Sequence, residues 1–327
     1  MKKILVTGAA GFIGSVVTEQ LVEQGYDVIA LDSLKNGHRA AIHPGARFVQ
    51  VDLLDNERLE QVLHDNPVEA VVHLAAEALI DESIRNPGRF FRANICGGVN
   101  LLEAMAKAGV KRIVFSSSAA VYGEPVEVPV QETATLQPVN SYGYSKLAFE
   151  QMLPWYQRAY GLKHISLRYF NACGATARCG ENHVPETHII PILFDVAQGQ
   201  RQAINLYGAD YDTPDGSCIR DYVHVLDIAS AHLLALNALD SDATGVYNMG
   251  NGMGYSNREV IQAVSRVTHK EINFVVAPRR PGDPARLVAS SQKIRQELGW
   301  QPRFPDLDSM IETAWRWRLS HPTGYAA

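Results

Sequence analysis

The chain has 327 residues, of which 46% are hydrophobic and 20% are charged, and its formal net charge is −5. A chain of this length and composition can bury a full hydrophobic core without disulfides or metals. It contains no basic cluster, which argues against nucleic acid as a partner, because phosphate binding needs grouped Lys and Arg side chains.

Short apolar runs alternate with amphipathic stretches in the first half of the chain, a pattern typical of a parallel sheet covered by helices. The runs are apolar at consecutive positions, as expected when both faces of the sheet are covered. The expected strands are Ile4–Thr7, Asp27–Leu31, Arg47–Val51, Ala70–Leu74, Arg112–Ser116 and His164–Arg168. The expected helices are Phe12–Glu23, Glu57–His64, Arg89–Lys107 and Tyr142–Tyr160.

The second half of the chain has a different pattern. Ala177–Glu186 is polar and rich in turn formers, which indicates a domain boundary or a substrate-facing loop. The shorter elements expected around it are Ala203–Tyr207, Arg220–Val223, Asp227–Leu239, Val246–Met249, Ser256–Thr268 and Leu307–Arg318. We therefore expect an α/β fold: a Rossmann-type, doubly wound parallel sheet over residues 1–176 and about 224–249, with a smaller α/β substrate-binding lobe over about 177–223 and 250–327.

The four cysteines indicate neither a zinc site nor a disulfide framework. Cys96, Cys173, Cys179 and Cys218 form no CxxC pair, so we expect a reducing cytoplasm and no metal. The apolar run near the start ends at Thr7, which is too short for a signal peptide. No stretch approaches the roughly 18 apolar residues of a membrane span, so no membrane partner is expected.

A glycine-rich turn lies between the first expected strand and the first expected helix, as Gly8-Ala9-Ala10-Gly11-Phe12-Ile13-Gly14. Gly8 and Gly11 would allow a pyrophosphate to approach the helix N-terminus, where free N–H groups and the helix dipole favour anions. Gly14 would let the helix pack close to the sheet. A purely structural glycine turn is the alternative, and its placement between strand and helix favours the dinucleotide site.

The ends of the next strands carry side chains that suit the rest of a dinucleotide. Asp32 could accept hydrogen bonds from the adenosine ribose and would repel a 2′-phosphate, which favours NAD over NADP. Asp52 and Leu53 could reach the adenine. Leu74-Ala75-Ala76 has mostly small side chains and would leave room for the cofactor against the backbone.

Tyr142 and Lys146 are four residues apart, so they share one helix face. Ser118 ends a serine triplet at a strand end, where ligands bind in α/β sheets. Lowering a tyrosine pKa by about three units takes roughly 4 kcal/mol, which an ammonium and a charged nicotinamide ring can supply. Tyr142 would then take a proton from a sugar hydroxyl, with Ser118 bonded to the same oxygen. Because this spacing is common by chance, a surface Tyr–Lys pair is the alternative.

Together these motifs are similar to those of the extended short-chain dehydrogenase/reductase family, and within it to the UDP-hexose 4-epimerases, over essentially the whole chain. The matching segments are Thr7–Gly14, Ser116–Gly123, Ser141–Lys146, Leu167–Asn171, Pro185–Pro191 and Pro214–His224. The resemblance implies an NAD-dependent isomerase with a retained cofactor. Hydride would leave C4 of UDP-glucose or UDP-galactose, and would return to the opposite face after the keto sugar has turned.

The resemblance also implies roles for individual residues. Asn171 and Arg220 would hold the UDP diphosphate or ribose, Arg280 the diphosphate, and Asp283 the uridine ribose, while Asn94 would support the active site. The expected cofactor residues are Gly8, Gly11, Phe12, Ile13, Gly14, Asp32, Asn36, Asp52, Leu53, Leu74, Ala75, Ala76, Asn94, Ser116, Tyr142, Lys146 and Tyr169. The expected substrate residues are Ser118, Tyr142, Asn171, His188, Ile189, Asn205, Tyr207, Arg220, Arg280 and Asp283.

Other functions remain open at this point. A nucleotide-sugar 4,6-dehydratase would need an acid and a base where Ala119 and Ala120 stand, and a non-catalytic NAD-binding protein would typically lack the Tyr or the Lys. Epimerases of UDP-pentoses or UDP-uronates are not separated by the sequence. Leu287 falls near a position whose side-chain size is linked in the family to acceptance of N-acetylated sugars. Because leucine is smaller than tyrosine, UDP-N-acetylhexosamines also remain possible substrates.

Two positions depart from the family pattern, since Ala78 replaces a lysine that touches the cofactor and Ala120 replaces a threonine.

The resemblance further implies a homodimer through helices near Arg89–Lys107 and Tyr142–Tyr160. The apolar faces of these helices would also fit simple packing against the sheet.

Overall fold

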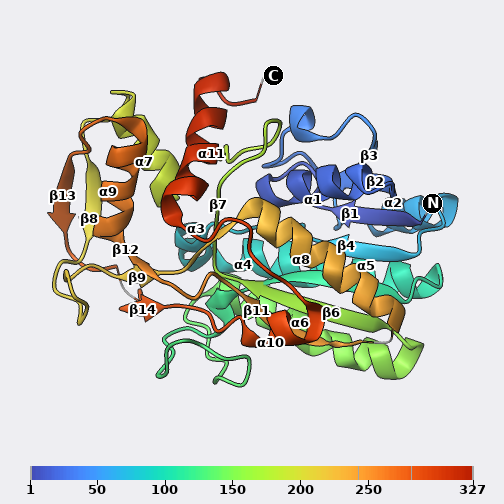
Figure 1. The fold of residues 1–327 in the computed structure, drawn as a ribbon. Coiled ribbons are helices and arrows are strands. Elements are labelled where there is room, and N and C mark those ends of the chain that lie inside the picture. Colours follow the sequence, from blue (N-terminus) through green and yellow to red (C-terminus); the bar gives the residue numbers. More distant parts are fainter. Residues whose placement is uncertain (1, 242, 281, 326–327) are drawn as a thin grey trace.

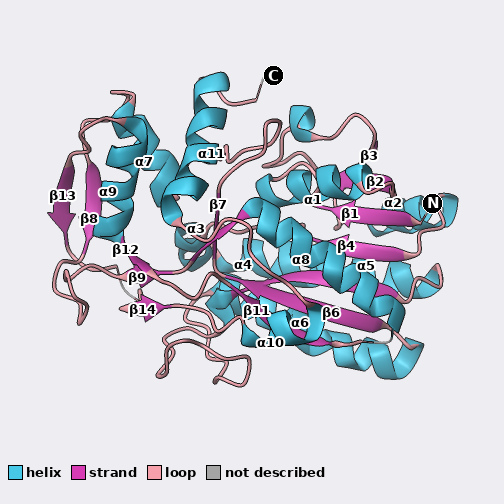
Figure 2. Cartoon of the chain, viewed as in Figure 1, coloured by secondary structure: helices cyan, strands magenta, loops and turns pink. Residues whose placement is uncertain are grey.

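The computed structural model describes residues 2–241, 243–280 and 282–325. Its centre is a seven-stranded sheet in the order β11-β6-β5-β4-β1-β2-β3, and every neighbouring pair is parallel (Figure 2). The strands are β1 Lys3–Thr7, β2 Asp27–Asp32, β3 Arg47–Gln50, β4 Ala70–His73, β5 Arg112–Ser118, β6 Lys163–Tyr169 and β11 Gly245–Met249. The predicted Rossmann-type α/β sheet is confirmed.

Helices cover both faces of the sheet, which explains why its strands are apolar at consecutive positions (Figure 1). Ile4 and Val6 of β1 pack into the core beneath α1 and α8, whereas Leu5 packs into the core beneath α2, α5 and α6. The helices of the first face are α1 Phe12–Glu23, α8 Val225–Ala238 and α10 Gln292–Leu298; those of the second are α2 Asn56–Asp65, α5 Gly97–Lys107 and α6 Ser141–Tyr160.

The predicted helix Arg89–Lys107 is more complex than its sequence pattern suggests. The short helix α3 (Ile80–Arg85) is followed by α4 (Pro87–Phe90), and α4 continues into α5 through a π-helical turn at Phe91–Cys96. Such turns insert one extra residue and often lie at functional sites. Here the turn contains the predicted residue Asn94.

A third hydrophobic core belongs to a smaller lobe, which lies beside the sheet in Figure 1. Its helices are α7 Ile189–Ala197, α9 Asn257–Thr268 and α11 Leu307–Ser320, and its strands are β7 Asn171–Cys173, β8 Ile204–Tyr207, β9 Ile219–Arg220, β10 Tyr222–His224, β12 Tyr255–Ser256, β13 Phe274–Ala277 and β14 Arg286–Leu287. We propose the predicted division for the folded chain, because α8 and β11 join the large sheet whereas α7, α9 and α11 share the separate core. Two elements depart from it: α10 packs on the large sheet although it lies within 250–327, and β7 pairs with β10 although it lies within 1–176.

The predicted strand Arg220–Val223 is interrupted at Asp221, and its two parts join different small sheets. The buried Asp221 carboxylate accepts backbone N–H groups of Asn251, Gly252 and Ala289. This side chain therefore ties three segments together where the chain passes from one sheet to the other. None of the helices in the described part of the chain has the length and apolarity needed to cross a membrane.

Candidate active site

A cavity of about 710 Å³ opens at the carboxyl ends of the central strands, and both lobes line it. Gly8 follows β1, Asp32 ends β2, Leu74 follows β4, Ser118 ends β5 and Tyr169 ends β6, and all five line the cavity. The strand order changes direction at β1, with β2 on one side and β4 on the other. In open α/β sheets, ligands bind at such a switch point.

The glycine-rich turn is held in close contact with its surroundings. Gly8 has φ +72°, and a Cβ there would lie 2.5 Å from the backbone nitrogen of Ala75. A Cβ at Gly14 would lie 1.9 Å from the carbonyl oxygen of Gly8, so Gly14 allows α1 to pack against the turn. Gly11 is the N-cap of α1 and provides no side-chain cap. The first N–H groups of α1 can therefore serve an anion in the cavity.

Asp32 combines a structural contact with a place in the cavity wall. Its Oδ2 accepts the N–H of Ala10 at 2.9 Å, and its Oδ1 accepts the N–H of Leu34 at 2.8 Å. Burial raises the pKa of this carboxyl, and the backbone bonds oppose that effect. Each carboxylate oxygen has further acceptor capacity, so Asp32 can fix the glycine-rich turn and still accept from a ribose hydroxyl.

The other residues predicted for the adenine and for the backbone wall also line the cavity: Phe12, Ile13, Asn36, Asp52, Leu53, Ala75 and Ala76. Asp52 forms an ion pair with Lys35 at 2.5 Å, and the lysine hydrogen bond and charge lower the pKa of Asp52 against the effect of burial. Lys35 lines the cavity as well. A cation therefore lies at the end where the adenosine is expected, in the loop after β2, whereas the lysine missing at Ala78 would lie after β4.

Helix α6 starts close to the turn that follows β5. Its N-cap Asn140 accepts the N–H of Gly143 at 2.8 Å. A Cβ at Gly143 would lie 2.4 Å from the carbonyl oxygen of Ala120, in the 3₁₀ turn Ala119–Val121. The glycine thus permits an approach that any other residue would prevent, and it brings the first turns of α6 to the end of β5.

Tyr142, Lys146 and Ser118 meet in the cavity as predicted. The Nζ of Lys146 donates to the carbonyl oxygen of Ser116 at 2.9 Å and lies 5.9 Å from the centre of the Tyr142 ring. Burial lowers the pKa of Lys146 to about 7. Burial raises the pKa of Tyr142, and a hydrogen bond with Ser118 opposes this effect. In the protein alone Tyr142 therefore keeps its proton, and a cation beside it is needed to make it a base.

Two predicted cofactor residues, Asn94 and Ser116, lie behind the cavity wall and do not line it. The Nδ2 of Asn94 donates to Ser145 Oγ at 2.9 Å and to the carbonyl oxygen of Glu77 at 3.0 Å, and its Oδ1 accepts the N–H of Glu77 at 2.8 Å. Ser116 shares a hydrogen bond of 2.8 Å with His232 Nε2. These contacts connect Asn94 to the strand-end segment after β4 and to α6.

The smaller lobe supplies the opposite wall. The predicted residues there, all lining the cavity, are Asn171, His188, Ile189, Asn205, Tyr207, Arg220, Arg280 and Asp283. Arg220 forms a hydrogen-bonded ion pair with Asp283. The Cζ of Arg280 lies over the face of the Tyr207 ring, 4.0 Å from its centre. Two guanidinium groups therefore face the same cavity as the Tyr–Lys pair.

Sequence reasoning missed several lining residues, including Glu77 and Tyr222. Glu77 accepts from Asn36 Nδ2 at 3.1 Å and pairs with Arg89 at 2.9 Å, and its position directly after Leu74-Ala75-Ala76 was a signal. The buried Tyr222 hydroxyl has no hydrogen-bond partner among the described residues. The position of Tyr222 two residues after the predicted Arg220 could have indicated that it lines the cavity. The neighbouring sequence does not show that its side chain is buried.

Known proteins resemble the chain over its whole length. The sequence model of the NAD dependent epimerase/dehydratase family matches residues 4–250. A UDP-glucose 4-epimerase of Streptococcus mutans is 49% identical over 98% of this chain and 98% of that protein. A crystal structure of a UDP-glucose 4-epimerase has a TM-score of 0.97 at 46% identity and covers 100% of both chains. The Bifidobacterium longum enzyme in complex with NAD+ and UDP has a TM-score of 0.94 at 36% identity, over 99% of this chain and 100% of that one.

The chain combines a Rossmann-type sheet, a glycine turn before a helix without a side-chain N-cap, and a Tyr–Lys–Ser group. These features define an enzyme that uses a nicotinamide dinucleotide. The chain belongs to the NAD dependent epimerase/dehydratase family, and within it to the UDP-glucose 4-epimerases. It is an NAD-dependent isomerase. The family, the enzyme class and the cofactor predicted from the sequence are thereby confirmed.

Proposed function

We propose that this chain interconverts UDP-glucose and UDP-galactose by inverting C4 of the hexose, with NAD retained throughout. The observation that carries this proposal is the single cavity in which Tyr142, Lys146 and Ser118 face Arg220 and Asp283. NAD, when bound, accepts a hydride from C4 and returns it to the opposite face of the sugar. The protein's own side chains bind both molecules, orient them and move the proton.

The cofactor half of the cavity fits NAD. The uncapped N-terminus of α1 behind Gly11 would hold the pyrophosphate, because its N–H groups have no side-chain acceptor. Asp32 and Asn36 would hold the adenosine ribose, and Asp52 with Leu53 would flank the adenine. The segment 74–76 would let the nicotinamide half lie against backbone.

Tyr142 would take the proton of the C4 hydroxyl while hydride leaves the carbon. Ser118 would hydrogen-bond the same oxygen, since its hydroxyl already bonds the phenol. The phenolate needs roughly 4 kcal/mol of stabilisation for a pKa shift of about three units. Lys146 supplies part of this when protonated, and its bond to the Ser116 carbonyl keeps the ammonium beside the ring. The pair then returns the proton when C4 is reduced again.

The other half of the cavity would hold UDP. Arg220 and Arg280 would bind diphosphate oxygens, for which the guanidinium fork is well shaped. Asp283 holds Arg220 in the free protein and would accept uridine ribose hydroxyls in the complex. Asn171 would assist at the diphosphate. Four further residues would complete the nucleotide wall: His188, Ile189, Asn205 and Tyr207.

One competing reaction is disfavoured by the cavity itself. Ala119 and Ala120 line it at the positions where a 4,6-dehydratase needs proton-transferring groups, and alanine cannot transfer protons.

Leu287 also lines the cavity and is smaller than tyrosine. This supports a second candidate substrate class, the UDP-N-acetylhexosamines, with UDP-pentoses and UDP-uronates as further alternatives.

We also propose a homodimer in the cytoplasm. The four cysteines are free thiols, which suits a reducing compartment.

Large apolar side chains on the π-helical turn and on α6 support the homodimer, with exposed fractions of 37% for Phe91, 54% for Tyr144, 66% for Trp155 and 49% for Tyr160. A second copy packed on these helices would bury them. Light scattering of the purified protein tests this, and a monomer at micromolar concentration would refute it.

The activity is tested by incubating the purified protein separately with UDP-glucose and with UDP-galactose, without added cofactor. Chromatography should show each sugar nucleotide converted to the other. Loss of water from the product would favour the dehydratase instead. No conversion of any UDP-hexose would refute the proposal. Conversion of UDP-N-acetylglucosamine in a parallel reaction would show the wider substrate range.

A further inference from the structure

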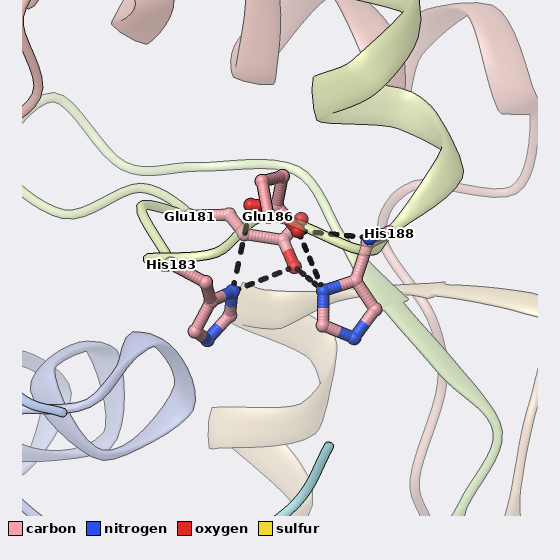
Figure 3. A group of neighbouring side chains, drawn as sticks. All are labelled: Glu181, His183, Glu186 and His188. Carbon is pink, nitrogen blue, oxygen red and sulfur yellow. Dashed lines mark hydrogen bonds and ion pairs between the residues drawn. The ribbon is translucent and has the colours of Figure 1, made fainter. Parts of the chain in front are cut away.

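Four potential metal ligands converge on one loop between Gly180 and α7, and the proposed reaction does not use them as a group. They are Glu181, His183, Glu186 and His188, and Figure 3 shows their side chains turned toward one another. One donor atom from each lies within 4.8 Å of all the others. Because all four belong to a stretch of eight residues, one ion could chelate the whole loop.

The two donor–donor distances of His183 match the edges of a zinc tetrahedron, and the two of His188 are shorter. His188 Nδ1 lies 2.8 Å from Glu181 Oε1 and 3.0 Å from Glu186 Oε1. His183 Nδ1 lies 3.4 Å from Glu181 Oε1 and 3.6 Å from Glu186 Oε2. Zinc bonds of about 2.0–2.2 Å place neighbouring tetrahedral ligands roughly 3.3–3.6 Å apart. The two carboxylates would have to move away from His188 by roughly half an ångström to make room for an ion between the ligands.

One atom of the cluster points specifically to a ligand. His183 Nδ1 is shielded from solvent, and within the described ranges no group meets it with good hydrogen-bond geometry; its ion-pair contacts to Glu181 and Glu186 are long, at 3.4 and 3.6 Å. Buried polar atoms are normally paired, so such an atom calls for a partner. The neighbouring Glu181 and Glu186 side chains are only 11% and 17% exposed. In the metal-free protein the two carboxylates raise the pKa of His183 to about 9 and that of His188 to about 10, so zinc would take the place of the two imidazole protons.

We propose that Glu181, His183, Glu186 and His188 bind one Zn²⁺ ion per chain. Two imidazole nitrogens with two carboxylate oxygens favour zinc over magnesium or calcium, which prefer all-oxygen sites. Four protein ligands complete the tetrahedron, so the ion is structural and has no open position for chemistry. The cysteine spacing predicted no metal, but the pattern of these ligands, E-x-H-x-x-E-x-H, contains no cysteine.

The ion would stabilise one wall of the substrate cavity. Glu181, His183 and His188 line that cavity, and His188 is the N-cap of α7 without a side-chain cap bond. Zinc held through Nδ1 of His188 would leave its Nε2 free to face the substrate. The expected contact of His188 with UDP and its role as a metal ligand are therefore compatible, because the two ring nitrogens serve different partners.

The test uses the full-length protein with its NAD, purified without a polyhistidine tag. After dialysis against a chelator, Zn²⁺ is added back and the excess is removed. Elemental analysis should find one zinc per chain, and the melting temperature should rise on zinc addition and fall again with chelator. Co²⁺ in place of zinc should give the visible absorption of a tetrahedral site. A folded wild-type protein that takes up no zinc would overturn the proposal.

Two variants and a matched control locate the site. His183→Ala and Glu186→Gln should each weaken zinc binding by more than about 100-fold, since even outer contacts of metal sites contribute 10- to 100-fold. His64→Ala removes a histidine whose side chain is 88% exposed and pairs only with Asp65, so it should keep one zinc per chain. If His183→Ala retains stoichiometric zinc, the assignment of the ligands is wrong. NAD content per chain shows that each variant is folded.

Discussion

Two glycines of the dinucleotide turn should respond differently to substitution by alanine: one change should lower the stability of the fold, and the other should weaken the binding of NAD. In Gly14→Ala the new Cβ would lie 1.9 Å from the Gly8 carbonyl oxygen and 3.1 Å from the Cα of Ala9, both of which are backbone atoms. Alanine in a helix normally adds about 0.5–1 kcal/mol of stability over glycine. Overpacking costs about 1–3 kcal/mol, and here α1 must move away from the turn as a unit. Because the clash is with backbone, the cost lies near the upper end, at about 3 kcal/mol, and we expect a net loss of about 2 kcal/mol.

Gly11→Ala should leave stability unchanged and act on the cofactor instead. Gly11 has φ −80° and ψ 172°, an extended conformation that alanine adopts freely. The nearest atom to its new Cβ is the Gly8 carbonyl oxygen at 3.4 Å, an ordinary contact. The free energy of unfolding of the cofactor-free protein should therefore change by less than about 0.5 kcal/mol. The added methyl group would occupy the space through which a pyrophosphate approaches the backbone.

Thermal unfolding of the cofactor-free proteins measures the first effect, and NAD retained per chain after gel filtration measures the second. A loss of 2 kcal/mol corresponds to about 3 °C in a protein of this size. Gly14→Ala should melt lower by about that amount, whereas Gly11→Ala should melt with the wild type and lose NAD. Wild-type stability in Gly14→Ala would refute the packing argument. Wild-type NAD content in Gly11→Ala would place the pyrophosphate elsewhere.

Three further predictions concern the cavity. Tyr142→Phe should lower kcat by about 10²- to 10⁴-fold with NAD still bound, because the base is lost and the ring remains; substantial activity in the chromatographic assay would refute the assignment. Burial lowers the pKa of Lys146 from 10.5 to about 7, so the unfolded chain binds more protons between these values and stability rises with pH from about 7. Lys146→Met should flatten this rise in denaturant unfolding of the cofactor-free protein, and equal slopes would contradict it. Arg220→Ala should raise KM for both UDP-sugars by about 10- to 100-fold, the value of a charged hydrogen bond, and an effect on kcat alone in initial-rate kinetics would exclude the diphosphate role.

The large sheet could be predicted because burial on both faces leaves a strong local pattern. β1, β4 and β5 are runs of consecutive apolar residues, and helices of ordinary length separate them. The smaller lobe offered no such pattern. β9, β12 and β14 contain two residues each, and their pairing depends on the Asp221 carboxylate, whose partners lie far along the chain. Long-range contacts of this kind have no local sequence signal.

The same distinction applies to the site. Residues at strand ends, such as Asp32 and Ser118, could be predicted because topology alone brings strand ends together. Asn94 reaches the site only indirectly, through Ser145 and the backbone of Glu77. A π-helical turn sets its direction, and the 3.6-residue period of the sequence pattern does not reveal that turn. The hydrogen bonds that lie behind the cavity wall could therefore be found only from the structure.

Tyr142 and Lys146 show what the four-residue spacing needs in addition to form the proposed catalytic pair. The spacing places both side chains on one helix face, but Gly143 against the Ala120 carbonyl sets how near that face comes to Ser118. The bond from Lys146 to the Ser116 carbonyl then fixes the ammonium. With a pKa of about 7, Lys146 gains or loses its proton near neutral pH, and this charge in turn controls the phenol. Because only the protonated lysine stabilises the phenolate, loss of this proton would lower the rate on the basic side of the pH–rate profile.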